Sequence, residues 1–299
     1  MRYTLGVDIG GTKVAAVIIS ESQEILYRAE VPSNPQDKEK MFKQVVKSID
    51  MVLTESNLQV KDIEGMGVGV PGKVDRENGI AIYQNNLPWE NFPIVKRLQE
   101  SFSIENIIID NDVYMAAFAE WTAANIKGEK TFVYVTVSTG VSCSIIHNGS
   151  FIRGAGFAGE LGLFPVLSHS TSRGLNNLEK AASGPAIQKL AVQYFDDGDI
   201  TLEDIFRKYQ NGDSTAQILI QEVIDSLAHG IYSIICLLDP HKIVFGGGVM
   251  IHNSFLLDLV KTELRNYLIP EQQNILSRME ISHYKQNAGI IGAGLKGKE

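Results

Sequence analysis

Apolar residues along this chain follow two alternating periods. Short continuous apolar runs predict buried β-strands at residues 66–70, 107–109 and 242–245. Between such runs, apolar residues recur every three or four positions, which predicts amphipathic helices over about residues 42–53, 114–123, 179–195 and 214–238. Strands that alternate with helices indicate an α/β fold with parallel strand pairing.

Two hairpin-like segments, one in each half of the chain, share the same order of residue types. A Gly-Gly-Thr turn at residues 10–12 and a Ser-Thr-Gly turn at residues 138–140 each join two apolar runs. Backbone N–H groups exposed in such turns form a concave site for anions, and glycine lets a ligand approach because it has no Cβ. An ordinary hairpin explains either turn alone. Their recurrence, with Asp8 just before the first turn, favours a pair of phosphate-binding turns.

The length of the chain and the absence of a flexible linker indicate its domain organisation. Its 299 residues suggest two domains. No linker rich in proline or serine separates the two similar halves, so we expect a cleft between them. The small-residue segment 287–294 predicts the start of a helix that packs back on the first half. A third strand is expected at residues 23–27.

Charge and cysteine content narrow the possible partners and compartment. A net charge of -8 argues against nucleic acid as a partner, because nucleic-acid-binding proteins carry a basic surface. The apolar run 234–238 is far shorter than a membrane span, and a strand so close to the N-terminus leaves no room for a signal peptide. We therefore expect a cytoplasmic protein with no membrane partner. Cys143 and Cys236 are predicted to be buried thiols.

Several short motifs occur in an order that resembles the ROK family of sugar kinases, named for repressors, open reading frames and kinases. The motifs are Asp8-Ile9-Gly10-Gly11-Thr12-Lys13, Asn86-Leu87, Asn111-Asp112, Gly159-Glu160, Glu179 with Ser183-Gly184-Pro185-Ala186, and Gly246-Gly247-Gly248. The resemblance spans nearly the whole chain. It implies an actin-like, ribonuclease-H-like ATPase fold, whose two lobes enclose a central cleft for ATP and a hexose. We expect residues 1–114 with 287–299 to form the N-terminal lobe, and residues 115–286 the C-terminal lobe.

The best candidate for the catalytic base is Asp112. It follows a predicted strand, at the end where α/β sheets bind their ligands. A carboxylate there can accept the proton of an attacking hydroxyl, although local sequence alone favours a helix N-cap. The resemblance favours the base, because the family's catalytic aspartate follows an asparagine as Asp112 follows Asn111. Asp110 is a weaker candidate for either role.

The part of the site that holds the phosphoryl donor is expected to bind ATP and magnesium. Asp8 would hold Mg²⁺ through a water, since magnesium keeps several waters beside one or two carboxylates. An aspartate capping its own turn is the alternative for this residue. The remaining residues assigned to ATP by their position in the motifs are Gly10, Gly11, Thr12, Lys13, Thr139, Gly140, Gly247 and Gly248. Lys13 is equally consistent with an ordinary surface lysine.

The acceptor side is expected to bind sugar hydroxyls. The resemblance assigns Asn86, Asn111, Asp112, Glu160 and Glu179 to it. An asparagine amide offers both a donor and an acceptor, and the two glutamates offer acceptors. Without the resemblance, both glutamates would be interpreted as solvated surface residues. Trp89 is either a platform for the sugar or part of the loop packing.

The chain departs from the family pattern in two places. Its second turn carries Ser138 and the segment 142–144 where relatives have glycines, which restricts backbone approach. Many relatives also hold a structural zinc with three cysteines and a histidine, but residues 168–178 contain no cysteine and only His169. We therefore predict no zinc site. Apolar packing of Leu163, Phe164 and Leu175 is expected to hold this loop instead.

Three functions are consistent with these residues and motifs. The first is phosphorylation of the 6-hydroxyl of glucose or a related hexose, with a β-glucoside or another modified hexose as the alternative substrate class. The second is a sugar-responsive repressor, which would need a DNA-binding module before Leu5, where only four residues stand. The third is a sugar sensor without catalysis, favoured by the serine-substituted turn. The resemblance also implies a homodimer formed through the second lobe.

Overall fold

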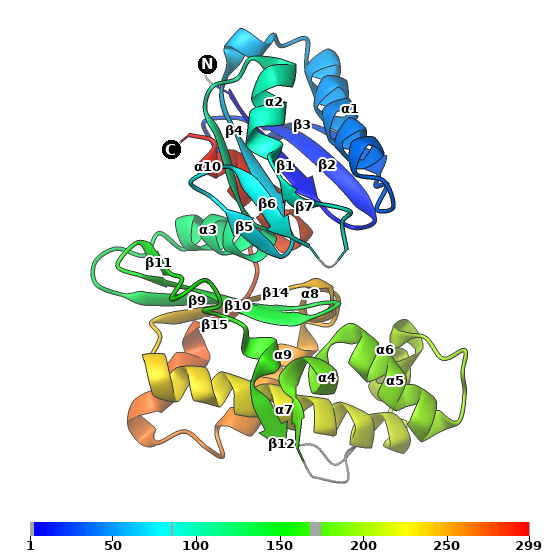
Figure 1. Cartoon of the computed structure of the whole chain (residues 1–299). Helices are drawn as coiled ribbons and strands as arrows, with labels where there is room; N and C mark the ends of the chain where they lie inside the picture. Colours follow the sequence, from blue (N-terminus) through cyan, green and yellow to red (C-terminus); the bar gives the residue numbers. More distant parts are fainter. Residues whose placement is uncertain (1–2, 85, 168–174, 299) are drawn as a thin grey trace. The chain divides into compact units, whose positions relative to one another are not determined.

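The computed structural model describes residues 3–84, 86–167 and 175–298, and these form two compact units (Figure 1). Unit 1 runs to Asn125 and includes the segment from Asn287 to the C-terminus, and unit 2 comprises Ile126–Gln286. The chain therefore leaves unit 1 after Asn125, not at residue 114 as predicted. The reason is that helix α3 (Asp112–Ala124) packs on helix α10 (Ala288–Lys296) and belongs with it.

Unit 1 is built on a five-stranded mixed sheet. Its strand order is β3 (Ile25–Pro32), β2 (Lys13–Ile19), β1 (Tyr3–Ile9), β4 (Ile63–Val70) and β8 (Ile107–Asn111). The three strands β1, β2 and β3 pair antiparallel, whereas β4 pairs parallel with both β1 and β8. The predicted strands and parallel pairing are confirmed, although the third strand lies at 25–32 rather than 23–27. Helices α1 (Lys38–Ser56) and α2 (Ile94–Phe102) complete the unit, with a 3₁₀ turn, η1, at Val60–Asp62.

Helix α10 packs directly against the sheet on one side and against α3 on the other, because glycines lie at both contacts. A Cβ placed on Gly67 of β4 would lie 1.8 Å from the carbonyl oxygen of Ala293, and one placed on Gly292 would lie 1.7 Å from that of Met115 in α3. Such distances leave no room for any side chain. The predicted return of the C-terminal helix to the first unit is therefore confirmed, with α10 packed between the sheet and α3.

A small antiparallel sheet in unit 1 was not predicted. It consists of β5 (Lys73–Asp75), β6 (Ile80–Tyr83) and β7 (Glu90–Phe92). These strands have only three or four residues, too few for an apolar period to be recognised. The loop between β6 and β7 contains the predicted sugar-binding residue Asn86.

Unit 2 repeats the sheet order of unit 1. Its strands are β11 (Ser150–Ile152), β10 (Val141–His147), β9 (Thr131–Val137), β14 (Lys242–Gly246) and β15 (Met279–Ile281). As in unit 1, an antiparallel hairpin is followed by parallel strands. A separate two-stranded sheet joins β12 (Pro165–Leu167) to β13 (Leu175–Asn177).

The helices of unit 2 follow the predicted periods with one interruption. The predicted helix 179–195 is split into α4 (Leu178–Ala182) and α5 (Gly184–Phe195), because the Ser183 hydroxyl accepts a hydrogen bond from the Ala186 N–H and caps α5. The other helices are α6 (Leu202–Gln210), α7 (Ser214–Leu238), α8 (Gly248–His252) and α9 (Phe255–Leu264), with 3₁₀ segments η2 (Leu161–Leu163), η3 (Pro270–Arg278) and η4 (Lys285–Asn287).

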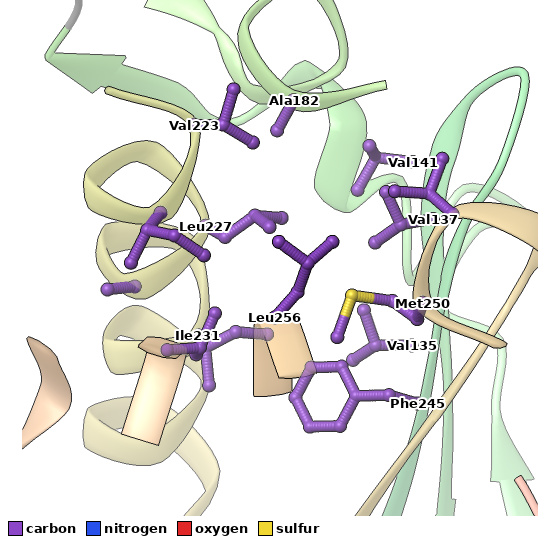
Figure 2. Packing of buried hydrophobic residues seen from close by; sticks show 14 of the residues in the cluster. Val135, Val137, Val141, Ala182, Val223, Leu227, Ile231, Phe245, Met250 and Leu256 are labelled. Atoms are coloured by element: carbon purple, nitrogen blue, oxygen red, sulfur yellow. The ribbon is translucent and has the colours of Figure 1, made fainter. Parts of the chain in front are cut away.

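The core of unit 2 lies between α7 and the sheet (Figure 2). Leu227 and Ile231 of α7 point toward Val135 and Phe245 of the sheet, with Leu256 of α9 between them. By length and composition α7 would also pass for a membrane span, but 61% of the apolar window is buried inside the unit. This degree of burial is typical of a helix in the core of a globular unit.

Two expectations about apolar residues are wrong. Cys143 is buried, as predicted, but Cys236 near the end of α7 is exposed. In the loop after Glu160, Phe164 packs on the core, whereas Leu163 and Leu175 expose 67% and 55% of their surface. Apolar packing of the two leucines therefore does not hold this loop.

Gly67→Ala is expected to lower the free energy of unfolding by about 1–3 kcal/mol or more, because the added methyl group would overlap the backbone of α10. Chemical denaturation measures the change. Gly198→Ala is the matched control, since a Cβ there meets nothing within 4 Å. Equal effects of the two substitutions would contradict the close packing of α10 on the sheet.

Candidate active site

In unit 1, the parallel strands bring two aspartates to the same edge of the sheet, on either side of a glycine. The register pairs Asp8 of β1 with Gly69 of β4, and Gly69 with Asp110 of β8. Gly69 has no side chain, and a Cβ placed there would lie 3.7 Å from the Asp8 carboxylate. A Cβ there would also lie 3.5 Å from Met115 Cγ, so the Asp8 carboxylate and the Met115 side chain lie over Gly69, at the carboxyl ends where such sheets bind ligands.

Asp112 lies just beyond this edge as the first residue of α3. The helix is capped by its neighbour Asn111, whose side-chain oxygen accepts a hydrogen bond of 2.9 Å from the Val113 N–H. The N-cap interpretation of Asp112 is therefore wrong. The Asp112 carboxylate also accepts from the Val113 N–H, at 2.9 Å, and burial raises the pKa of Asp112.

Asp8 and Asp112 are electrostatically coupled. Burial raises the pKa of Asp8 to about 6, and the negative charge of Asp112 acts in the same direction, while Lys13 and Arg28 act in the opposite one. By surface area the Asp8 side chain is only half-buried, so solvent or a bound ion can reach it. A half-buried carboxylate that repels a second one is a favourable place for a hard cation. This donor set fits Mg²⁺, which prefers carboxylate oxygens and retains waters.

The first turn is fixed by the end of β3 and leaves two amides available. The Gly10 N–H donates to the Lys13 carbonyl at 2.9 Å, and the Ser33 hydroxyl donates to the Gly10 carbonyl at 2.6 Å. Among the residues that the structure describes, the backbone N–H groups of Gly11 and Thr12 find no acceptor. Such paired free amides in a turn can bind a phosphate oxygen.

Lys13 points to a different partner. Its ammonium group lies 3.0 Å from both carboxylate oxygens of Glu30, and 58% of the side chain is exposed. The surface-lysine interpretation therefore describes Lys13 in this structure.

Asn86 lies against the first turn, as its predicted role requires. A Cβ placed on Gly11 would be 2.9 Å from the Asn86 Cβ. Trp89, in contrast, is only 2% exposed, stacks on Phe92 with ring centroids 4.7 Å apart, and donates from its indole N–H to the Lys38 carbonyl. The loop-packing interpretation of Trp89 is confirmed, and the sugar-platform interpretation is wrong.

In unit 2, the second turn is joined to Glu179. The Glu179 carboxylate accepts a hydrogen bond of 3.2 Å from the Val141 N–H, and a Cβ placed on Gly140 would lie 2.6 Å from it. The turn closes on itself, because the Ser138 N–H donates to the Gly140 carbonyl at 2.8 Å. The serine therefore does not prevent the turn from forming.

Glu160 is close enough to Glu179 to sense its charge. The pKa of Glu160 is raised, first by burial and then by the negative charge of Glu179. Both side chains remain accessible to solvent. The two predicted sugar acceptors therefore lie together in unit 2, next to the second turn.

The Gly-Gly-Gly segment lies at the carboxyl end of β14, beside the end of β9. Gly247 has φ of +82°, and a Cβ there would lie 2.3 Å from the Val137 carbonyl, so only glycine fits. Gly248 begins α8. On the same unit, a pocket of about 500 Å³ has Thr139 of the second turn and Glu179 in its wall, together with Lys180, Ser183 and Lys189. Its volume is in the range of small-molecule sites.

The predicted residues thus form one cluster in each unit. Unit 1 gathers Asp8, residues 10–12, Asn86, Asn111 and Asp112, and unit 2 gathers Thr139, Gly140, Glu160, Glu179, Gly247 and Gly248. The contributions of Ser33 and Gly69 were missed, because Ser33 acts through a hydroxyl bonded to the backbone and Gly69 through the lack of a side chain. Strand register was the one signal that could have found Gly69.

No group of three His, Cys, Asp or Glu side chains that could hold a metal ion occurs in the described ranges 3–84, 86–167 and 175–298. His169, considered for the zinc site, lies outside these ranges. The zinc-free character of the chain stays a prediction.

Residues 4–296 match the ROK family. The chain belongs to this family. It is 29% identical to a glucokinase of Halalkalibacterium halodurans, over 98% of this chain and 94% of the glucokinase. It is 31% identical to an N-acetylmannosamine kinase of Escherichia coli, over 98% of this chain and 97% of that kinase. A xylose repressor of Caldicellulosiruptor bescii is 24% identical over 96% of this chain and 76% of the repressor.

Solved ROK structures share the fold. A ROK hexokinase from Thermus thermophilus has a TM-score of 0.81 at 28% identity, covering 99% of this chain and 97% of the hexokinase. A ROK glucokinase from Streptomyces griseus, in complex with glucose and AMPPNP, has a TM-score of 0.80 at 24% identity and covers 99% of both chains. The chain thus has the actin-like ATPase fold of ROK kinases, and the comparisons support an ATP-dependent sugar kinase.

Asp8→Asn is expected to raise the free energy of unfolding by on the order of 1–3 kcal/mol at pH 8 in the absence of Mg²⁺. The pKa of Asp8 is raised in the folded protein to about 6, so its ionised form opposes folding above that pH. The gain should shrink as the pH falls from 6 toward 4, where folded Asp8 is protonated. Urea denaturation at several pH values measures it. Glu55→Gln, an exposed carboxylate on α1, should change stability little, and an Asp8→Asn variant that behaves like it would contradict the raised pKa of Asp8.

Proposed function

We propose that this chain transfers the terminal phosphoryl group of ATP to the 6-hydroxyl of a hexose, glucose or a close relative. The observation that carries the proposal is the position of Asp112 at the carboxyl edge of the sheet, where its charge raises the pKa of Asp8. Asp112 comes two residues after Asp110, which lies in the same row of the sheet as Asp8 and Gly69. Membership of the ROK family and the two kinase relatives support it.

Asp112 acts as the general base in this proposal. Its carboxylate accepts the proton of the attacking hydroxyl, and burial strengthens it as a base by raising its pKa. Asp8 would hold Mg²⁺, by way of a water, and the ion would supply neutralisation of the phosphate charge. The free amides of Gly11 and Thr12 bind phosphate oxygens of the donor.

The remaining assignments follow the two clusters. Thr139, Gly140, Gly247 and Gly248 bind the nucleotide. Asn86, Asn111, Glu160 and Glu179 bind sugar hydroxyls, for which carboxylates and amides offer suitable acceptors. We also propose a homodimer and a cytoplasmic location, which size-exclusion chromatography with light scattering and cell fractionation would test.

The choice of sugar is open between several hexoses. The relatives include a glucokinase and an N-acetylmannosamine kinase, and a β-glucoside is a further candidate. A coupled assay of ADP release with glucose, mannose, fructose, N-acetylmannosamine and cellobiose would rank them. We expect glucose or a near relative to give the highest kcat/KM, and sugar binding without ADP release would favour a sensor instead.

The sensor is the second candidate function. The serine-substituted second turn favours it, and the xylose repressor among the relatives agrees with a regulatory role. The free amides of Gly11 and Thr12 in the first turn favour the kinase, because they fit a bound phosphate oxygen.

Asp112→Asn is expected to lower kcat by about 10²–10⁴-fold while sugar affinity changes only a few-fold, because the amide keeps the hydrogen-bonding shape but cannot take the proton. The coupled assay gives kcat, and calorimetry with glucose gives affinity. Asp50→Asn on α1 is the control and should keep turnover. A near-normal kcat of Asp112→Asn would show that another group is the base.

A further inference from the structure

We infer that Arg76 is a positioning residue. It acts through Asp110 to hold the small sheet β5–β6–β7 in place beside the end of β8. Through this tether it sets Asn86 relative to Asn111 and Asp112 within unit 1. The inference rests on the proposed function only for its kinetic test, because the tether itself can be measured without a substrate.

The first contact of the tether is an ion pair at the edge of the main sheet. The Arg76 Nε lies 3.3 Å from Asp110 Oδ2, and the Asp110 side chain is only 2% exposed whereas Arg76 is 43% exposed. Arg76 follows β5, and Asp110 lies in β8, two residues before Asp112. The other carboxylate oxygen of Asp110 accepts from the Asn111 N–H at 2.9 Å. One carboxylate therefore joins the small sheet to the turn that presents the candidate base.

A second contact holds the other end of β5. The Asn111 side-chain amide donates to the Gly72 carbonyl at 3.0 Å, and Gly72 directly precedes β5. The segment 72–76 is thus bound to β8 at both of its ends. Two points of attachment fix both the distance and the direction of β5, which a single contact would not do.

The same segment is bound to the loop that contains Asn86. The Gln84 side-chain amide donates to the Lys73 carbonyl at 3.2 Å, and β5 pairs with β6 just before this loop. At its far side the loop meets the phosphate turn, where Asn86 lies against Gly11. A shift of β5 would therefore be transmitted to Asn86, while the turn at residues 10–12 is held separately by Ser33.

The energetics favour positioning over simple stabilisation. A buried ion pair gains little net free energy over apolar side chains, because desolvation cancels much of its attraction. Loss of Arg76 is costly, because it removes a positive charge from beside the buried Asp110 carboxylate. Because Arg76 is 43% exposed, the pair contributes little net stability, and its main effect is to hold the end of β5 next to β8.

The test separates the tether from general stability. Arg76→Met is expected to raise the KM for the best sugar of the panel about 10-fold and to leave the KM for ATP within about 2-fold, since only the acceptor side is displaced. Arg76→Lys should recover most of the sugar affinity. Arg76→Met/Asp110→Asn should regain stability, because no buried charge remains, but keep the raised sugar KM because the tether is still missing. Arg207→Met is the control, since Arg207 pairs with Asp204 within α6 of unit 2, away from the small sheet.

Hydrogen exchange tests the tether without a substrate. In Arg76→Met, backbone amides of β6 and β7 should exchange faster than in the wild type, while those of α1 keep their rate. Unchanged exchange in β6 and β7, equal changes in the two KM values, or full recovery of sugar KM in the double variant would each overturn the inference. Should the wild-type protein phosphorylate no sugar, the proposed function fails, and the exchange experiment still decides the tether.

Discussion

The mutual repulsion of two carboxylates, Asp8 and Asp112, is the interaction on which the candidate site depends. Both lie at one edge of the unit 1 sheet, and the charge of Asp112 adds to burial in raising the pKa of Asp8 to about 6. A fold selected only for stability would not place two partly buried acids together. Their proximity makes sense where a cation and a phosphate chain bind, because the cation relieves the repulsion and the phosphates share its charge.

The rest of unit 1 serves to bring these groups together. Parallel pairing places the ends of β1, β4 and β8 side by side, and Gly69 adds no side chain between Asp8 and Asp110. Helix α10 packs between the sheet and α3, because Gly67 allows backbone contact with the sheet and Gly292 allows it with α3. The chemistry of the site thus depends on glycines as much as on the charged residues.

Much of this arrangement could be predicted from the sequence. The hairpin turns, the parallel strands and the ends of α7 follow from apolar periods and glycine positions, and the candidate site residues were chosen from ordered motifs. The small sheet β5–β6–β7 was not predicted, because its strands are too short to show an alternation of apolar and polar residues. The boundary at Asn125 and the break at Ser183 depend on packing and capping, which a local pattern does not contain. Trp89 and Lys13 show the same limit. The sequence alone does not tell whether a tryptophan stacks on a sugar or packs in a loop, or whether a lysine binds a ligand or lies at the surface.

The most direct test of the central claim is the pKa of Asp8, measured by ¹³C NMR of its carboxyl carbon in the Mg²⁺-free protein. We predict a pKa of about 6 in the wild type and a lower pKa once Asp112 is replaced by asparagine, because one source of repulsion is then removed. An Asp8 that titrates near 3.8 in both proteins would contradict the claim, since the two carboxylates would then not share one site.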